Sequence, residues 1–319
     1  MNNLRRLVPL ALTAALLLAT IYVFRDQIAL EQLSARFAAV NLWYLAVSVV
    51  FFLAGFAGAV YRNKFVIDRA TGSGISFKYL FLVSNFSYTL GYVAPVSIAA
   101  EVLRIGLIKS HLAISYTKSL RLVVIDKFLG FTGMAVFAIL FIPLKVAFGV
   151  DRTVMTVEGA LLLGFFLLVP LVARGAAFAS DRFSRLRPLM AVPLEDWQFL
   201  VENFSDRRDI VIFMLCSTLA VGGFSVAMVL VAAAMQLQAL ALIFAIAPTI
   251  LLVQNIPLFY AGFGAREAML LLMLGNESGA DPNQVLGFSM LVGVMLFASA
   301  IPATLGFFFR GSRHMEADV

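Results

Sequence analysis

Charged residues, cysteine and histidine are scarce in this sequence. Lysine, arginine, aspartate and glutamate make up 13% of the 319 residues, whereas soluble domains contain about 25%. The single cysteine, Cys216, lies in an apolar run, so it supports neither a disulfide framework nor a thiolate cluster. The two histidines, His111 and His314, have no partner at metal-ligand spacing. We therefore expect no metal site and no redox chemistry.

Motifs for nucleotides and nucleic acids are also missing. No GxxxxGK[ST] loop occurs, and the pair Gly262 and Gly264 lacks the third glycine and the preceding strand of a dinucleotide fingerprint. The basic residues are scattered at the ends of apolar runs, which fits loops facing an anionic inner leaflet better than a nucleic-acid surface. We expect no cofactor, no nucleic-acid partner and no enzymatic activity.

Long apolar runs dominate the chain. Hydrophobic residues reach 62% and the mean hydropathy is +0.96, which predicts an all-α polytopic membrane protein. Residues 1–319 would form one transmembrane domain. A retained span at 7–24 precedes an interfacial amphipathic helix at 26–37. Further spans are predicted at 41–61, 122–142, 155–173, 210–235 and 285–309.

Two apolar segments are interrupted, at 77–109 and at 239–275. The first contains Pro95, which cannot continue a helix, and then Glu101 and Arg104. The second is broken at 255–267, NIPLFYAGFGARE. Charges within apolar sequence are functional-site candidates, because a charged group near the bilayer centre costs about 2.5–3.5 kcal/mol on insertion scales. In the alternative interpretation, Arg104 lies at the interface and its charged end extends to water.

Loop charges predict that the two segments are re-entrant hairpins that enter from opposite sides. The loops 62–78 and 109–121 are basic and should be cytoplasmic, whereas 236–238 and 276–284 lack basic residues and should lie outside. The pattern is an inverted repeat of spans, with repeats at 41–142 and 210–309 joined by a linking span at 155–173 and a cytoplasmic segment at 174–209. Both termini are predicted to be cytoplasmic, with the protein in the inner membrane.

The charges of the two hairpins suggest a polar site near the membrane midplane. Glu101 and Arg104 are three residues apart and should pair on one helix face, whereas the adjacent Arg266 and Glu267 should not face the same way. We expect these charges to approach one another around a cavity in which Arg104 and Arg266 bind phosphate. Backbone N–H groups at the starts of the half-helices would add further donors for this phosphate. Asp126 is either a proton-coupling carboxylate or the partner of a neighbouring base.

The same residues resemble a known family. The runs NFSYTLGYVAPVSIAAEVLRI, SYTKSLRLVVIDKFLG and NIPLFYAGFGARE are similar to the signatures of the lysylphosphatidylglycerol synthase transmembrane, or flippase-like, family. Two departures are the glycine-free interval VSIAA before the acid and a lysine at 127 where the family has arginine. The candidate substrate-binding residues are Asn85, Tyr92, Pro95, Glu101, Arg104, Asp126, Lys127, Asn255, Pro257, Tyr260, Gly262, Gly264, Arg266 and Glu267.

The resemblance implies a protein that moves lipids or lipid-linked head groups between leaflets. Multidomain members carry a soluble aminoacyl-transferring domain, and since this chain stops at Val319 without one, we expect no synthesis of aminoacyl-lipid. Two alternatives remain open. One is a membrane enzyme that transfers a group to or from a lipid phosphate with Glu101 or Asp126 as base; the other is a scaffold subunit of an envelope assembly. The expected partners are anionic or phosphate-bearing lipids, with a second copy or an envelope-synthesis enzyme left open.

Overall fold

The computed structural model describes residues 37–93, 97–152, 154–156, 158–160, 162–164, 206–255, 264–274 and 281–314, which are helical and contain no strand. Four helices are long and apolar enough to cross a membrane: Leu42–Thr71, Tyr116–Leu140, Arg207–Ala234 and Pro282–Phe307. The predicted all-α polytopic membrane fold is therefore confirmed. Three predicted segments lie wholly or mostly outside the described residues: the span at 7–24, the interfacial helix at 26–37 and the segment 174–209. The linking span at 155–173 is described only in part.

Helix α3, Leu42–Thr71, continues ten residues beyond the predicted end of its span. The prediction of a loop from residue 62 was wrong, because Arg62 and Asn63 are buried in the helix. Lys64 and Asp68 pair one turn apart on the helix surface. The helix ends at Gly72, whose φ of 66° is left-handed and whose N–H bonds to the Asp68 carbonyl. The loop to the next helix is thus only residues 72–76.

The first interrupted segment is a pair of short helices, α4 (Phe77–Val93) and α5 (Ser97–Leu112). At 1.5 Å per residue, each is about 24–26 Å long, shorter than a hydrocarbon core of about 30 Å. Near the start of α4, Tyr79 stacks on His111 with ring centroids 3.8 Å apart, and its hydroxyl donates to the Leu107 carbonyl. The pair therefore doubles back, so that its two outer ends lie together.

The second interrupted segment has the same form. It consists of α11 (Leu240–Gln254) and α12 (Ala265–Leu274), which are about 22 Å and 15 Å long. Gln284, just after this pair, donates from Nε2 to the Met235 carbonyl just before it, at 3.0 Å. Both ends of the pair therefore open toward one end of the molecule.

The remaining helices are α6 (Tyr116–Leu140), α7 (Ile142–Ala147), α10 (Arg207–Ala234) and α13 (Pro282–His314). Helix α6 begins six residues before the predicted span, because the Ser115 side chain caps it by accepting from the Lys118 N–H. Helices α3 and α10 run antiparallel. Asn41 N–H donates to the Ala234 carbonyl at one end, and Arg69 Nε lies 3.1 Å from Asp209 Oδ2 at the other.

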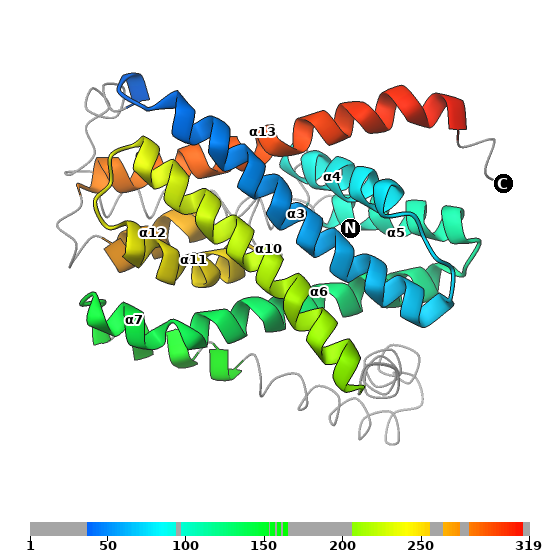
Figure 1. The fold of residues 1–319 in the computed structure, drawn as a ribbon, viewed down its shortest axis with the longest axis horizontal. Coiled ribbons are helices and arrows are strands. Elements are labelled where there is room, and N and C mark those ends of the chain that lie inside the picture. The colour runs from blue at the N-terminus through cyan, green and yellow to red at the C-terminus, as the bar shows by residue number, and fades with distance from the viewer. Residues whose placement is uncertain are drawn as a thin grey trace, which may run out of the picture.

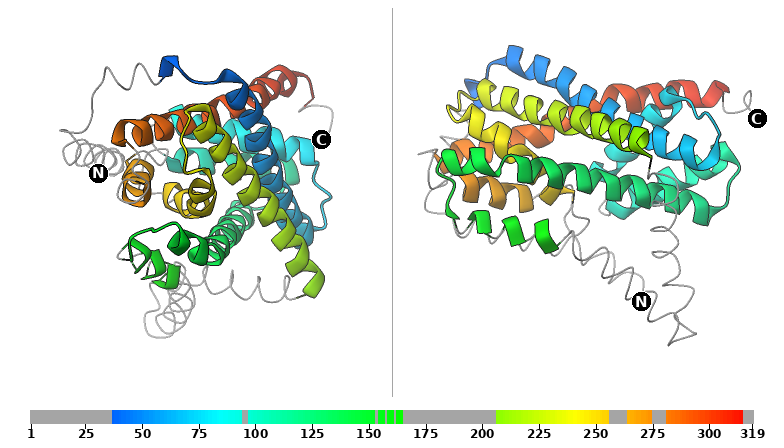
Figure 2. Two further views of the ribbon diagram at one scale, coloured as in Figure 1. Left: turned by 60° about the vertical axis from the view of Figure 1, so that its left-hand side comes forward. Right: turned by 60° about the horizontal axis from the view of Figure 1, so that its bottom comes forward.

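The helices are arranged as two related halves. Helix α4 packs on α13, and its counterpart α11 packs on α6. The α4–α5 pair lies toward one end of the molecule and the α11–α12 pair toward the other, with α3 and α10 crossing between them (Figures 1 and 2). This exchange of partners is compatible with the inverted repeat expected from the loop charges. The entry of the two pairs into a membrane stays a prediction.

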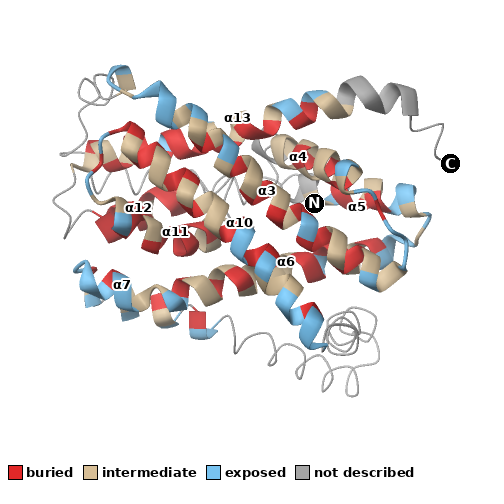
Figure 3. Cartoon of the chain, in the orientation of Figure 1, coloured by how far each residue is buried: buried red, intermediate tan, exposed pale blue. Residues whose placement is uncertain are grey.

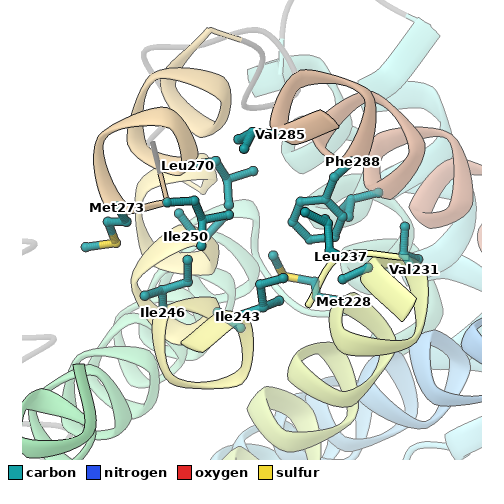
Figure 4. Packing of buried hydrophobic residues seen from close by; sticks show 14 of the residues in the cluster. Met228, Val231, Leu237, Ile243, Ile246, Ile250, Leu270, Met273, Val285 and Phe288 are labelled. Atoms are coloured by element: carbon teal, nitrogen blue, oxygen red, sulfur yellow. The ribbon is translucent and has the colours of Figure 1, made fainter. Parts of the chain in front are cut away.

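Each half has its own apolar core. Ten buried side chains from α3, the short loop, α4, α5 and α6 form the first core: Val60, Val66, Ile67, Ile75, Leu80, Ile105, Ile108, Leu122, Val123 and Ile125. The second core comes mainly from α10, α11, α12 and α13, and Figure 4 shows Phe288 and Leu270 packed against side chains of α10 and α11. Buried residues dominate α11 and α12, whereas α7 and the start of α10 are largely exposed (Figure 3).

Candidate functional site

Asp126 is the centre of a buried charge cluster formed by α3, α5 and α6. Its Oδ1 accepts from Arg62 Nε at 3.1 Å and its Oδ2 accepts from Asn63 Nδ2 at 2.9 Å. Arg104 Nη2 of α5 lies 3.6 Å from the same Oδ2. Both carboxylate oxygens are therefore engaged by partners on other helices.

Glu101 extends this cluster to the molecular surface. Its Oε2 lies 3.1 Å from Arg104 Nη2, so the predicted pairing three residues apart is confirmed, and its Oε1 lies 2.7 Å from Lys127 Nζ. Side-chain exposure rises from 5% at Asp126 to 11% at Arg104, 33% at Glu101 and 44% at Lys127. The interfacial interpretation of Arg104 does not fit this burial. The cluster instead opens on one side.

Arg62 and Asn63 are part of this site, although their sequence positions pointed to a cytoplasmic loop. The guanidinium of Arg62 lies directly over Gly130 of α6, where an added Cβ would come within 2.7 Å of Nη2. An added Cβ at this position would require the Arg62 guanidinium to shift. A signal for this geometry exists in the sequence, since Gly130 stands four residues after Asp126 and therefore on the same helix face.

Arg266 and Glu267 form a second buried cluster with Ser289 of α13. Arg266 is fully buried; its Nη2 donates to Glu267 Oε1 at 2.9 Å, and its Nε donates to Ser289 Oγ at 2.8 Å. Ser289 Oγ in turn donates to Glu267 Oε1 at 2.7 Å. The two adjacent residues were expected not to face the same way, yet their charged ends pair directly. Their Cβ atoms diverge by about 100°, but both side chains are long enough to converge on Ser289.

Gly264 and Gly293 complete the second cluster. Gly264 has a φ of 84°, in the left-handed region that favours glycine, and its N–H donates to Glu267 Oε2 at 2.6 Å. The backbone donor predicted at this half-helix start is therefore already used within the protein. A Cβ at Gly293 would lie 2.9 Å from Arg266 Nη2. In each half, then, a guanidinium lies against a helix glycine, and that glycine follows a polar residue of the same cluster by four positions.

The other predicted site residues lie apart from the two clusters or outside the description. Asn85 is buried in α4 and donates to the Phe81 carbonyl, and Asn255 ends α11 by donating to the Leu251 carbonyl. The two asparagines therefore serve their own helices. The side chain of Tyr92 and the residues Pro95, Pro257, Tyr260 and Gly262 are not among the described residues.

The charge clusters of the two halves are separate in the part of the chain that the structure describes. The ion pairs of the first link α3, α5 and α6, and those of the second lie within α12 and reach α13 through Ser289. No group of three or more histidine, cysteine, aspartate or glutamate side chains among these residues could hold a metal ion. The first cluster is the better candidate for a ligand, because it combines buried charge with an open side.

Comparison with known proteins places both clusters within one family match. Residues 7–306 match the profile of a protein family described as the lysylphosphatidylglycerol synthase TM region. No match was found among curated proteins.

Proposed function

Because this chain belongs to the lysylphosphatidylglycerol synthase transmembrane family and is a multi-pass membrane protein linked to lipid handling, we propose that it moves a phospholipid or a lipid-linked head group between leaflets. The lipid head group would pass through a polar cavity between the two hairpins, and its phosphate would bind the cluster around Arg104. The acyl chains would remain in hydrocarbon, since only the head group needs shelter.

The charge balance of the first cluster carries this proposal. Arg62, Arg104 and Lys127 supply three positive charges against the two negative charges of Glu101 and Asp126. An anionic phosphate would therefore neutralise the excess charge of a mostly buried site, where an uncompensated charge is unfavourable.

Arg104 has the geometry to make the contact. Its Nε and Nη2 are buried and make no well-aligned hydrogen bond with the described residues, although Nη2 lies near two carboxylates. A guanidinium presents donors in a planar fork that matches phosphate oxygens. The neighbouring Glu101 and Lys127 are partly exposed, so they offer a path by which the head group reaches Arg104.

Lipid exchange in liposomes tests the proposal. The purified protein is reconstituted with a fluorescent phospholipid or isoprenoid phosphate, and a membrane-impermeant reductant bleaches the dye in the outer leaflet. Arg104→Ala should slow exchange by about tenfold or more, because a charge-assisted hydrogen bond contributes about 1.5–3 kcal/mol. Arg104→Lys keeps the charge but not the fork, so we expect an intermediate rate.

The matched control is Arg69→Ala, which removes an arginine of α3 that lies outside the cluster and is 46% exposed. This variant should exchange lipid at the wild-type rate. Wild-type exchange by Arg104→Ala would overturn the head-group site. Exchange no faster than in protein-free liposomes, for every lipid tried, would overturn transport itself. Lipid recovered with an altered mass would instead favour the enzyme alternative.

A further inference from the structure

A third charged cluster lies apart from both sites, where α7, the helix Val154–Gly164 and α11 meet. Lys145 Nζ is 2.5 Å from Glu158 Oε1 and donates to Thr249 Oγ1 at 2.8 Å and to the Ala138 carbonyl at 3.1 Å. The Thr249 hydroxyl also donates to Glu158 Oε1. All three side chains are buried, and Lys145 is fully so.

Helix α7 exposes its apolar side chains and buries this lysine. Its neighbours Leu144 and Val146 are 36% and 56% exposed, while Lys145 is 0% exposed. An apolar exterior with a charged interior is the pattern of a helix in contact with lipid. The lysine therefore points into the protein, where its ammonium needs the carboxylate of Glu158.

The carboxylate of Glu158 is only half satisfied. Its Oε1 accepts from both Lys145 and Thr249, while Oε2 is buried and has no hydrogen-bond partner among the described residues. A purely structural ion pair in a dry interior would use both oxygens, because each unsatisfied polar atom is unfavourable. An oxygen with free lone pairs is where a carboxylate takes up a proton.

Lys145 is the charged group that faces Glu158 in the described surroundings. Helix α11 contains no charged residue, and the charges of α6 lie in its first half, at 118, 121, 126 and 127, three turns or more from Ala138. Asp151 and Arg152 precede the helix that carries Glu158. On α12, which packs on α11, Arg266 and Glu267 pair with each other. Within the described surroundings, Lys145 is therefore the charged partner of Glu158.

We propose that Glu158, together with Lys145 and Thr249, is an internal proton-binding site. A proton from the aqueous phase adds to Glu158 Oε2 and converts the carboxylate to the acid. The ammonium of Lys145 then loses its counter-charge and keeps only its bonds to Thr249 and the Ala138 carbonyl. A buried ammonium without a counter-charge is unfavourable, so proton binding weakens the packing of α7 against α11.

Helix α11 is suited to respond to this change. Pro248 precedes Thr249 within the helix and lacks an N–H, so the helical bond to the Phe244 carbonyl is missing at this point. The first arm of the second hairpin is thus weakest where it joins the cluster. Proton binding would therefore shift the preferred position of α11. This would couple protonation of Glu158 to movement of the second hairpin, a link that the lipid site alone does not provide.

Infrared spectroscopy of the reconstituted full-length protein tests the site without any transport measurement. Acidification from about pH 8 to about pH 5 should produce the C=O stretch of a protonated carboxylic acid, shifted in heavy water. The band should be lost in Glu158→Gln and retained in Glu101→Gln, which alters another ion-paired glutamate. Lys145→Met should move the titration midpoint to higher pH, because the carboxylate loses its positive partner.

The double variant Lys145→Met with Glu158→Gln is the control for folding, since it leaves no buried charge in the cluster, and it should lack the band. Absence of the band in the wild type over this pH range would overturn the proposal. So would a band that survives in Glu158→Gln, or a midpoint that does not move in Lys145→Met. None of these outcomes depends on lipid exchange, so the proton site and the lipid site can fail separately.

Discussion

At the scale of single residues, Asp126 holds the first cluster together, because it is the counter-charge for two buried arginines on different helices. Asp126→Ala should lower the free energy of unfolding by about 3–5 kcal/mol, the loss seen when one partner of a buried ion pair is removed. Reversible denaturation in detergent micelles, followed by circular dichroism, measures the change.

The adjacent Lys127 provides the control for this prediction. Its ion pair with Glu101 is 44% exposed on the lysine side, so Lys127→Ala should change stability by only about 0–1 kcal/mol. Equal losses for Asp126→Ala and Lys127→Ala would mean that burial does not determine the strength of this cluster.

Residue chemistry was predictable where a charge stands in apolar sequence, and so was the local pair of Glu101 with Arg104, whereas the long-range partners were not. That rule selected Glu101, Arg104 and Arg266, and the structure buries both arginines. Applied to the whole chain, it would also have selected Lys145 and Glu158, which lie in the runs IPLKVAF and MTVEGALLL. The partnership of Arg62 with Asp126, in contrast, spans 64 residues. Only the packing of α3 on α6 makes it visible.

At the scale of helices, the crossing of α3 and α10 depends on glycine. A Cβ at Gly223 would lie 2.7 Å from the Gly55 backbone nitrogen, and one at Gly58 would lie 2.7 Å from the Ala220 nitrogen. Backbone atoms cannot move aside as a flexible side chain can. This close approach is the small-residue packing by which membrane helices associate.

The neighbouring glycines of α10 allow a matched test. Gly223→Ala should destabilise the protein by about 1–3 kcal/mol, the range for overpacking. Gly222→Ala has no atom within 4 Å of the new Cβ, so it should be neutral or stabilising by up to about 1 kcal/mol. The same denaturation experiment compares them. Similar behaviour of the two variants would show that the helices do not cross at this point.

Helix positions followed from hydropathy, but helix ends did not. The predicted spans 210–235 and 285–309 begin three residues after the observed starts of α10 and α13. Helix α3 continues through Arg62 and Lys64 because long-range pairing and the Lys64–Asp68 pair stabilise its polar end. Charges that look like a loop in a hydropathy profile can be the buried end of a helix. Local composition does not distinguish the two.

At the scale of the whole molecule, the exchange of packing partners between the halves matches the repeat inferred from loop charges. In each half, the interrupted pair packs on the last long helix of the other half. The pairs therefore join the two halves through direct packing contacts. The α7–α11 contact at Lys145 is one such junction.

The orientation of this assembly in the membrane gives the last prediction. If α4 and α5 form a re-entrant hairpin, then the two outer ends of the pair face the same side, which their basic flanks place in the cytoplasm. With Cys216 replaced by serine, the exposed positions Ser73 and Ser110 are changed singly to cysteine. A membrane-impermeant maleimide should label both only after the cells are permeabilised.

Gln238, exposed in the turn between α10 and α11, is the opposite marker. Because its turn lies at the other end of the antiparallel α3 and α10, Gln238→Cys should be labelled in intact cells. Labelling of Ser73→Cys and Ser110→Cys from opposite sides would show that α4 and α5 together cross the membrane as one kinked span. The inverted topology would then fail, because α6 and all later helices would be reversed. If Ser73→Cys and Ser110→Cys are both labelled only from the inside and Gln238→Cys is labelled from the outside, the Arg104 cluster lies on a hairpin that enters from the cytoplasm.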